Sequence, residues 1–129
     1  LPALQKFQMN NNQIVGSIPD FSGCTNLRTL TLHRNNFTGY TSGAFKKLYR
    51  IRYLDISFNN LSQSALNTLL EDLLANWQAV KRGGVTINLK SQSGNVIPTP
   101  FGPGMDAAKI LSNNGWDIGI SPGGIQSNL

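Results

Sequence analysis

The chain has 129 residues, the length of one domain, and with 40% hydrophobic and 13% charged residues it is too apolar for a disordered protein and too polar for a membrane-embedded one. One Cys excludes an internal disulfide framework and a Cys-rich zinc site, and one His leaves little for metal binding, so we expect neither a metal nor a cofactor. The formal net charge of +5 favours an anionic partner. No apolar run is long enough to predict a membrane span.

One pattern of apolar, polar and asparagine positions occurs three times, in residues 4–14, 27–37 and 51–61. In the last copy Leu54 and Ile56 alternate with polar residues, and the other two copies repeat this alternation. A period of two predicts a short strand with one buried face in each copy. Because the copies are equivalent, we expect their strands to lie parallel and side by side.

With these residues the chain resembles the leucine-rich repeat family, whose core pattern is L-x-x-L-x-L-x-x-N-x-L in repeats of about 20 to 29 residues. The resemblance covers residues 1–61, and residues 14–19 are also similar to the L-x-G-x-I-P extension of plant-type repeats. It implies an α/β fold: a leucine-rich-repeat solenoid with a curved parallel sheet of about five short strands, and with loops and two helices on the outer side.

An asparagine follows each of the three strands, at Asn12, Asn35 and Asn59. An inward-turned amide in this column can bond to the loop backbone of adjacent units, which would otherwise be buried without partners. We therefore interpret these residues as a structural ladder, with ligand contact as the alternative. Gln92 occupies the corresponding position of a fourth unit.

Beyond residue 61 the apolar spacing becomes helical. Residues 66–80 predict a helix that Ser62 or Ser64 would cap and that the glycines at 83–84 would end, with the acidic pair at 71–72 facing outward.

The remaining elements alternate between strand and helix. Residues 85–89 predict a strand, 91–104 a loop, 105–113 a second helix and 116–120 a last strand. Trp116 is expected in the core of these last units rather than on a ligand platform.

The whole chain, residues 1–129, is therefore expected to form a single leucine-rich repeat domain. It divides into regular repeats (1–61), helix-bearing capping repeats (62–120) and a tail (121–129). No comparable cap precedes the first strand, so we expect additional repeats or another subunit at that end.

The polar strand positions form columns on the concave face, where the resemblance implies that partners bind. The candidate ligand-binding residues of this face are Lys6, Gln8, Asn10, Thr29, Thr31, His33, Tyr53, Asp55, Ser57, Thr86, Asn88 and Lys90. An array of hydroxyls, amides and one aromatic ring suits a polar protein surface or a glycan. The alternative is that an exposed sheet face is simply polar.

Catalysis is not expected on this face. His33 and Asp55, with Ser57 or Thr31, could be drawn as a hydrolase triad, but no nucleophile elbow or oxyanion hole accompanies them in the sequence. Asp55 is the only acid on the predicted inner columns, whereas a glycosidase needs two. The sequence therefore predicts no enzyme.

Basic residues gather in two places, at Lys46, Lys47, Arg50 and Arg52 and again at Lys81, Arg82 and Lys90. Neither group has the dense stripe with interleaved aromatic residues that is typical of nucleic-acid binding, so we expect no nucleic-acid partner. A solvated surface is the first interpretation and an anionic glycan the second. Two glycosylation sequons begin at equivalent positions, Asn36 and Asn60.

These features predict a non-catalytic recognition or adhesion module that is extracellular, on a cell surface or in a virion. The C-terminal units are similar to repeat modules of bacterial surface proteins and phage virion proteins. Two alternatives stay open: a structural subunit that packs on copies of itself or on a scaffold, and a fragment of a plant-type extracellular receptor.

Overall fold

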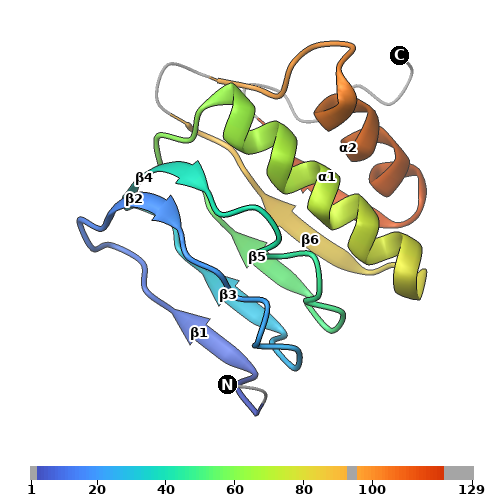
Figure 1. Ribbon diagram of the computed structural model, residues 1–129, viewed down its shortest axis with the longest axis horizontal. Helices are drawn as coiled ribbons and strands as arrows, with labels where there is room; N and C mark the ends of the chain where they lie inside the picture. Colours follow the sequence, from blue (N-terminus) through green and yellow to red (C-terminus); the bar gives the residue numbers. More distant parts are fainter. Residues whose placement is uncertain (1–2, 93–95, 121–129) are drawn as a thin grey trace.

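The computed structural model describes residues 3–92 and 96–120. The centre of the fold is a five-stranded sheet in which all neighbouring strands pair in parallel, in the order β1-β3-β5-β6-β7 (Figure 1). Its strands are β1 (Lys6–Gln8), β3 (Thr29–Thr31), β5 (Tyr53–Asp55), β6 (Val85–Asn88) and β7 (Trp116–Gly119). The predicted parallel sheet is confirmed, including the two strands that follow the regular repeats. The predicted tail, 121–129, lies outside the described residues.

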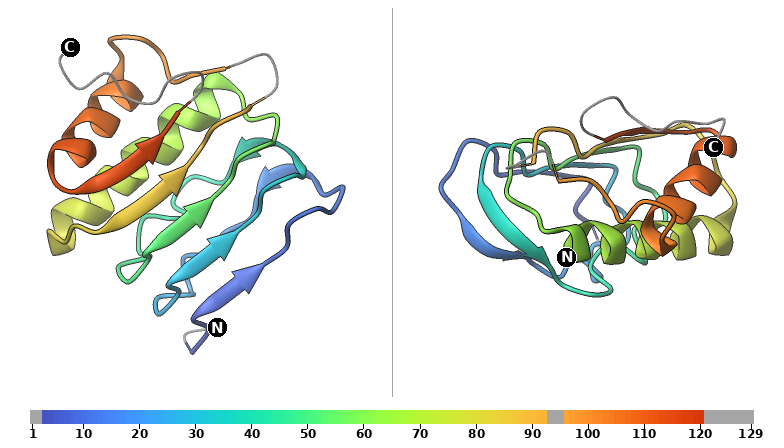
Figure 2. Two further views of the ribbon diagram at one scale, coloured as in Figure 1. Left: turned by 180° about the vertical axis from the view of Figure 1, so that it is seen from behind. Right: turned by 90° about the horizontal axis from the view of Figure 1, so that it is seen from above.

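The register of the sheet aligns the apolar strand positions into rows. Leu30 pairs with Leu54, Leu54 with Ile87, and Ile87 with Ile118, and all four side chains are at most 5% exposed. This row faces the helices, which lie on one side of the sheet (Figure 2). The period of two in the sequence therefore corresponds to one buried face and one face turned away from the helices, which we call the open face.

Two helices pack against the buried face, as predicted. The first, α1 (Gln63–Val80), is capped by Ser62, whose Oγ accepts the N–H of Ala65 at 3.1 Å. It ends at Lys81 in the left-handed conformation, with φ 52°, and not at the expected glycines. The Lys81 N–H already donates to the carbonyl of Trp77, so the helix needs no glycine to close it.

The second helix, α2 (Pro103–Asn113), begins earlier than predicted and shortens the expected loop. Proline at the first helical position has the required φ and lacks only an N–H that would be unpaired there. No helix in the described part of the chain is both long enough and apolar enough to span a bilayer.

A second, two-stranded sheet lies on the outer side of the early units and was not predicted. It pairs β2 (Val15–Ile18) with β4 (Asn36–Tyr40) in parallel (Figure 1). The two strands approach closely at Gly39, where a Cβ would lie only 2.6 Å from the Ser17 Oγ. The G-x-I-P resemblance in residues 14–19 was the available sequence signal for β2.

Asp72 does not face outward as expected. Its Oδ2 accepts the hydroxyl of Tyr40 and the N–H of Gly43, both at 2.7 Å, and the Tyr40 oxygen accepts the N–H of Phe45 at 2.8 Å. Burial, followed by the hydrogen bond to Asp72, raises the pKa of the Tyr40 phenol. One turn further along α1, the fully buried Asn76 donates to the Phe45 carbonyl at 3.2 Å. These contacts tie α1 to the regular units.

The side chains of the asparagine column join successive units. Asn59 Nδ2 donates to the carbonyls of Leu32 (3.0 Å) and Ile56 (3.1 Å), while its Oδ1 accepts the N–H of Phe37 (3.1 Å). Asn35 makes the equivalent set of bonds one unit earlier, and Gln92 makes it one unit later.

Asn12 differs from the other members of this column. It is exposed, and its Nδ2 donates at 3.2 Å to the carbonyl of Asn10 within its own unit. Within residues 3–92 and 96–120 its amide bonds to no other unit, so the bridging role of Asn12 stays a prediction.

Candidate binding surface on the open face of the sheet

The open face carries the polar positions of the five strands in register. Its first column runs from Lys6 through Thr29, Tyr53 and Thr86 to Asp117. Parallel pairing fixes these residues about 4.8 Å apart from strand to strand, so a ligand would meet a defined row of side chains.

The twelve candidate residues differ in exposure. Four are exposed: Lys6, Gln8, Tyr53 and Lys90. Five are partly buried: Asn10, Thr29, His33, Thr86 and Asn88. The other three are buried at 8% exposure or less: Thr31, Asp55 and Ser57. The expectation that all twelve present themselves to a ligand is therefore wrong for these three, which lie beneath their neighbours.

Asp55 is buried because it is the acceptor at the centre of a small hydrogen-bonded network. Its Oδ1 accepts the N–H of Ser57 at 2.9 Å and the Ser57 hydroxyl at 2.6 Å, and its Oδ2 accepts the Tyr53 hydroxyl at 3.2 Å. His33 Nδ1 lies 3.5 Å from the same Oδ2, an ion-pair distance that is long for a hydrogen bond. We call these four residues the Asp55 network.

The network orients the hydroxyl of Tyr53 through its hydrogen bond to Asp55. Burial and the negative charge of Asp55 raise the pKa of the Tyr53 phenol, which stays protonated and donating at neutral pH. Beside it, Thr31 Oγ1 and His33 Nδ1 are buried without a hydrogen-bond partner in the described residues. Two polar groups thus remain beneath the face next to a fully engaged carboxylate.

A shallow pocket of about 170 Å³ adjoins the network between β5, β6 and β7. Its lining residues are Tyr53, Thr86, Ile87, Asn88, Lys90, Asp117 and Gly119. Gly119 has a specific role there, because a Cβ at this position would lie 2.8 Å from the Lys90 Cε. The missing side chain leaves space for the stem of Lys90, which brings an ammonium group to the same pocket as a carboxylate.

Asp117 is the residue of this surface that the sequence analysis missed. It pairs with Thr86 in the first column. The expectation that Asp55 is the only acid on the inner columns is therefore wrong. The available signal was the alternation of the last strand: if Ile118 points into the core, its neighbour Asp117 must point outward.

The geometry of the Asp55 network differs from that of a hydrolytic triad. In a triad the nucleophile hydroxyl bonds to the base, whereas here the Ser57 hydroxyl donates directly to Asp55. No cluster of three metal-ligating side chains occurs among residues 3–92 and 96–120. The arrangement orders side chains at a surface, as a binding site requires.

Comparison with known proteins adds two similarities. A family model described as "Leucine rich repeat" matches residues 2–61 and 25–73. Podocan of Mus musculus is 43% identical over 65 residues, a segment that covers 48% of this chain and 11% of podocan. The chain therefore spans only about a tenth of that relative. No solved structure matches.

Proposed function

Because the chain belongs to the leucine-rich repeat family, we propose that it is a non-catalytic recognition module that binds a partner protein through the open face of its sheet. The observation that carries the proposal is the Asp55 network, which holds Tyr53 in one orientation at the centre of that face. Tyrosine is enriched at the energetic centre of protein interfaces. An anchor held from below loses little conformational entropy on binding.

The surroundings of Tyr53 support a polar protein partner. Its side chain is 37% exposed, so the ring is available while its hydroxyl stays hydrogen-bonded. The adjoining pocket offers Lys90 and Asp117, one charge of each sign. Such a pair fits the mixed charges of a protein surface better than a uniformly anionic ligand.

An extracellular location, as part of a bacterial surface protein, a virion protein or a receptor, belongs to the same proposal. The sequon residues Asn36 and Asn60 are both exposed, so in a secretory pathway of the eukaryotic type an enzyme could reach them. Mass spectrometry of the protein secreted from such cells would detect the added glycans.

The proposal is tested by the double variant Tyr53→Ala with Lys90→Ala, both exposed and outside the core. The matched control is Glu71→Ala with Gln78→Ala, two exposed residues seven positions apart on α1. The probe is a panel of purified extracellular proteins, screened with the unaltered chain and quantified by biolayer interferometry. The open-face variant should weaken each specific interaction about tenfold or more, because truncating one hot-spot residue costs about 2 kcal/mol. Unchanged affinity of the open-face variant, or equal loss in the control, would refute the proposal.

A structural subunit is the second candidate, and the exposure at the β1 end of the sheet favours it. Met9 is 40% exposed, whereas Leu32 and Ile56, which occupy the same core column in the later units, are at most 2% exposed. Further repeats or a second subunit would bury this surface. Light scattering of the unaltered chain and of Met9→Lys distinguishes the candidates: oligomers that Met9→Lys dissolves, together with an empty binding screen, would support the structural role.

A further inference from the structure

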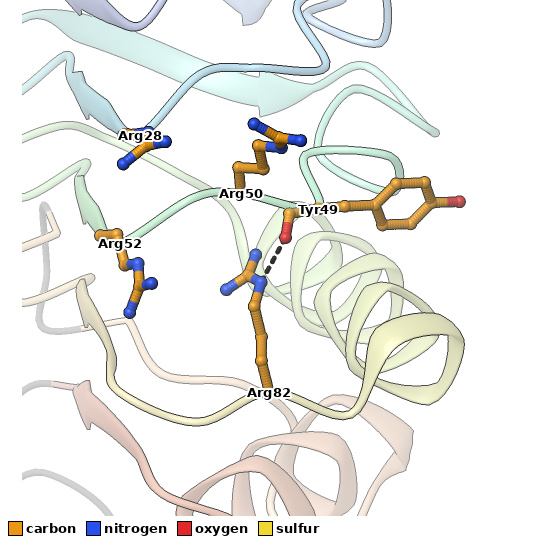
Figure 3. Close-up of a pocket in the computed structure, with 5 residues that line it drawn as sticks. All are labelled: Arg28, Tyr49, Arg50, Arg52 and Arg82. Atoms are coloured by element: carbon orange, nitrogen blue, oxygen red, sulfur yellow. Dashed lines mark hydrogen bonds between the residues drawn. The ribbon is translucent and has the colours of Figure 1, made fainter.

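Four arginines from three separate segments converge near the edge of the sheet where β3 and β5 begin. Arg28, Arg50, Arg52 and Arg82 line a pocket of about 190 Å³ together with Tyr49 (Figure 3). Arg28 and Arg52 precede neighbouring strands, and the Arg52 N–H donates to the Arg28 carbonyl at 2.8 Å. The sequence placed Arg50 and Arg82 in different basic groups and Arg28 in neither, so the fold creates this cluster.

Arg82 is held rigidly within the cluster. Its guanidinium donates to the carbonyls of Leu48 (3.0 Å), Ile51 (2.7 Å) and Tyr49, and it thereby closes the turn before β5. The Tyr49 ring points away from the arginines, and only its carbonyl faces Arg82 (Figure 3). Arg28, Arg50 and Arg52 are exposed beside this fixed group.

The positive charge of the pocket is not neutralised. No acidic residue lines it, and within the described ranges none of the four arginines forms a salt bridge. Burial, and after it the positive charge of Arg52, lowers the pKa of Arg82 to about 10, and the contribution of Arg52 is a repulsion between like charges. A bound anion would relieve this repulsion and would occupy guanidinium donors that face solvent.

We propose that this arginine pocket binds a sulfate group of a sulfated polysaccharide. The planar guanidinium presents paired donors that match the oxygens of an oxoanion, and it keeps its charge at every physiological pH. The pocket is smaller than the roughly 300–1,000 Å³ of sites for whole small molecules, so its size suits one anionic group of a larger ligand.

The flanking residues favour a chain with repeated charges over a single small anion. The exposed Lys46 and Lys47 lie on the segment that leads to Arg50, and the exposed Lys81 precedes Arg82. A polysaccharide with a sulfate in the pocket would place further sulfates near these lysines. The residues that line this pocket differ from those that line the pocket beside Tyr53.

The test uses heparin oligosaccharides and isothermal titration calorimetry near 0.1 M salt. Arg50→Gln with Arg52→Gln removes two exposed guanidinium groups, and Arg34→Gln with Lys109→Gln is the control with the same change of charge outside the pocket. We expect heparin to bind the unaltered chain, the arginine variant to bind about tenfold more weakly or worse, and the control to stay within about twofold. Desulfated heparin should not bind, and millimolar inorganic sulfate should compete.

Equal loss in both double variants would show general charge attraction and overturn the proposal. An equally tight complex with a polyglutamate peptide would assign the pocket to acidic proteins and would also overturn it. If the double variant melts lower than the control, Arg28→Gln replaces it, because this exposed side chain makes no hydrogen bond to any residue within 3–92 and 96–120. Arg50→Lys with Arg52→Lys should restore only part of the affinity, since lysine keeps the charge without the paired donors.

Discussion

The regular units (residues 4–61) and the helix-bearing units (residues 62–120) share one sheet but fill its outer side differently. In the regular units large rings fill the space behind the strands: Phe7 and Phe21 lie 5.4 Å apart between centroids, and Phe21 and Phe45 lie 6.3 Å apart. In the helix-bearing units α1 and α2 fill this space, and the two helices approach closely at Gly104. A Cβ on Gly104 would come within 2.7 Å of the Asn67 Cα.

The comparison shows that the strands need the same residue types in every unit, whereas the elements on the outer side can differ from unit to unit. The inward columns stay apolar through all five strands. The hydrogen bonds that join successive units are also made on both sides of the boundary, by the side-chain amides of Asn35, Asn59 and Gln92. The outer side can be loops, a second sheet or helices, provided that it buries the same face of the strands.

The largest effect is expected where the two regions meet, at Phe45. Its fully buried ring contacts Phe21 and Tyr40, and its carbonyl accepts from Asn76 of α1. Phe45→Ala should lower the free energy of unfolding by about 3–5 kcal/mol, through lost burial and a cavity. Urea denaturation followed by tryptophan fluorescence measures this, since both tryptophans belong to the helix-bearing units. A single transition with an unchanged dependence on urea would show that the two regions unfold together. A loss below about 1 kcal/mol would contradict the packing of Phe45 between them.

The amide ladder should be nearly as important, but only where a preceding unit exists. Asn59→Ala leaves the N–H of Phe37 and the carbonyls of Leu32 and Ile56 without their partner, so we expect a loss of about 2–3 kcal/mol. Asn12→Ala is the matched control in the same column and should cost less than about 0.5 kcal/mol. Similar losses of stability for both variants would contradict the prediction, because Asn12 makes no hydrogen bond to another unit within the described residues.

High pH should weaken the link between β4 and α1. The pKa of Tyr40 is raised in the folded state, so this phenol favours folding fully below its unfolded pKa near 10 and less as the pH rises above that value. Above pH 10 we expect the free energy of unfolding to fall by up to about 1.4 kcal/mol per pH unit from this group. Denaturation between pH 8 and pH 11 measures the slope. Tyr40→Phe should reduce it and Tyr49→Phe should not; equal slopes in both variants would assign the effect elsewhere.

The smallest effect tests the start of α1 alone. Ser62→Ala removes the Oγ that accepts the Ala65 N–H and should cost about 1 kcal/mol. Ser64→Ala, two residues away and exposed, should change stability by less than about 0.5 kcal/mol. Thermal melts followed by circular dichroism compare the two, and a larger loss for Ser64→Ala would contradict the assigned cap.

The parallel sheet, the order of its strands and both helices could be predicted from the sequence, because apolar periodicity specifies which faces are buried. It did not contain the second sheet: β2 and β4 include Gly16 and Gly39, and a glycine inside a short segment weakens the pattern of a strand. Helical spacing placed Asp72 on the solvent-facing side of α1, but the Tyr40 hydroxyl lies on that side and donates to its carboxylate. Such a contact depends on where another segment of the chain runs, which helical periodicity does not encode.

The candidate binding surface was predictable to a similar degree. Alternation placed the columns correctly, but the burial of Asp55 arises from three donors that converge on one carboxylate. The arginine pocket was beyond sequence reasoning, because Arg28 and Arg82 come together only through the stacking of units and the end of α1.

The left-handed residue beyond the strand recurs in four units, at Asn11, Arg34, Phe58 and Ser91, with φ between 56° and 60°. Three of their amides donate to the next unit, from Asn11 to His33, from Arg34 to Ser57 and from Phe58 to Lys90, so the backbone there is fixed by pairing. Four different side chains tolerate one conformation, and the Arg34 guanidinium lies 4.2 Å from the centre of the Phe58 ring. These positions form a row that a display library could vary with residues that accept this conformation, β-branched ones excluded, to engineer new affinities.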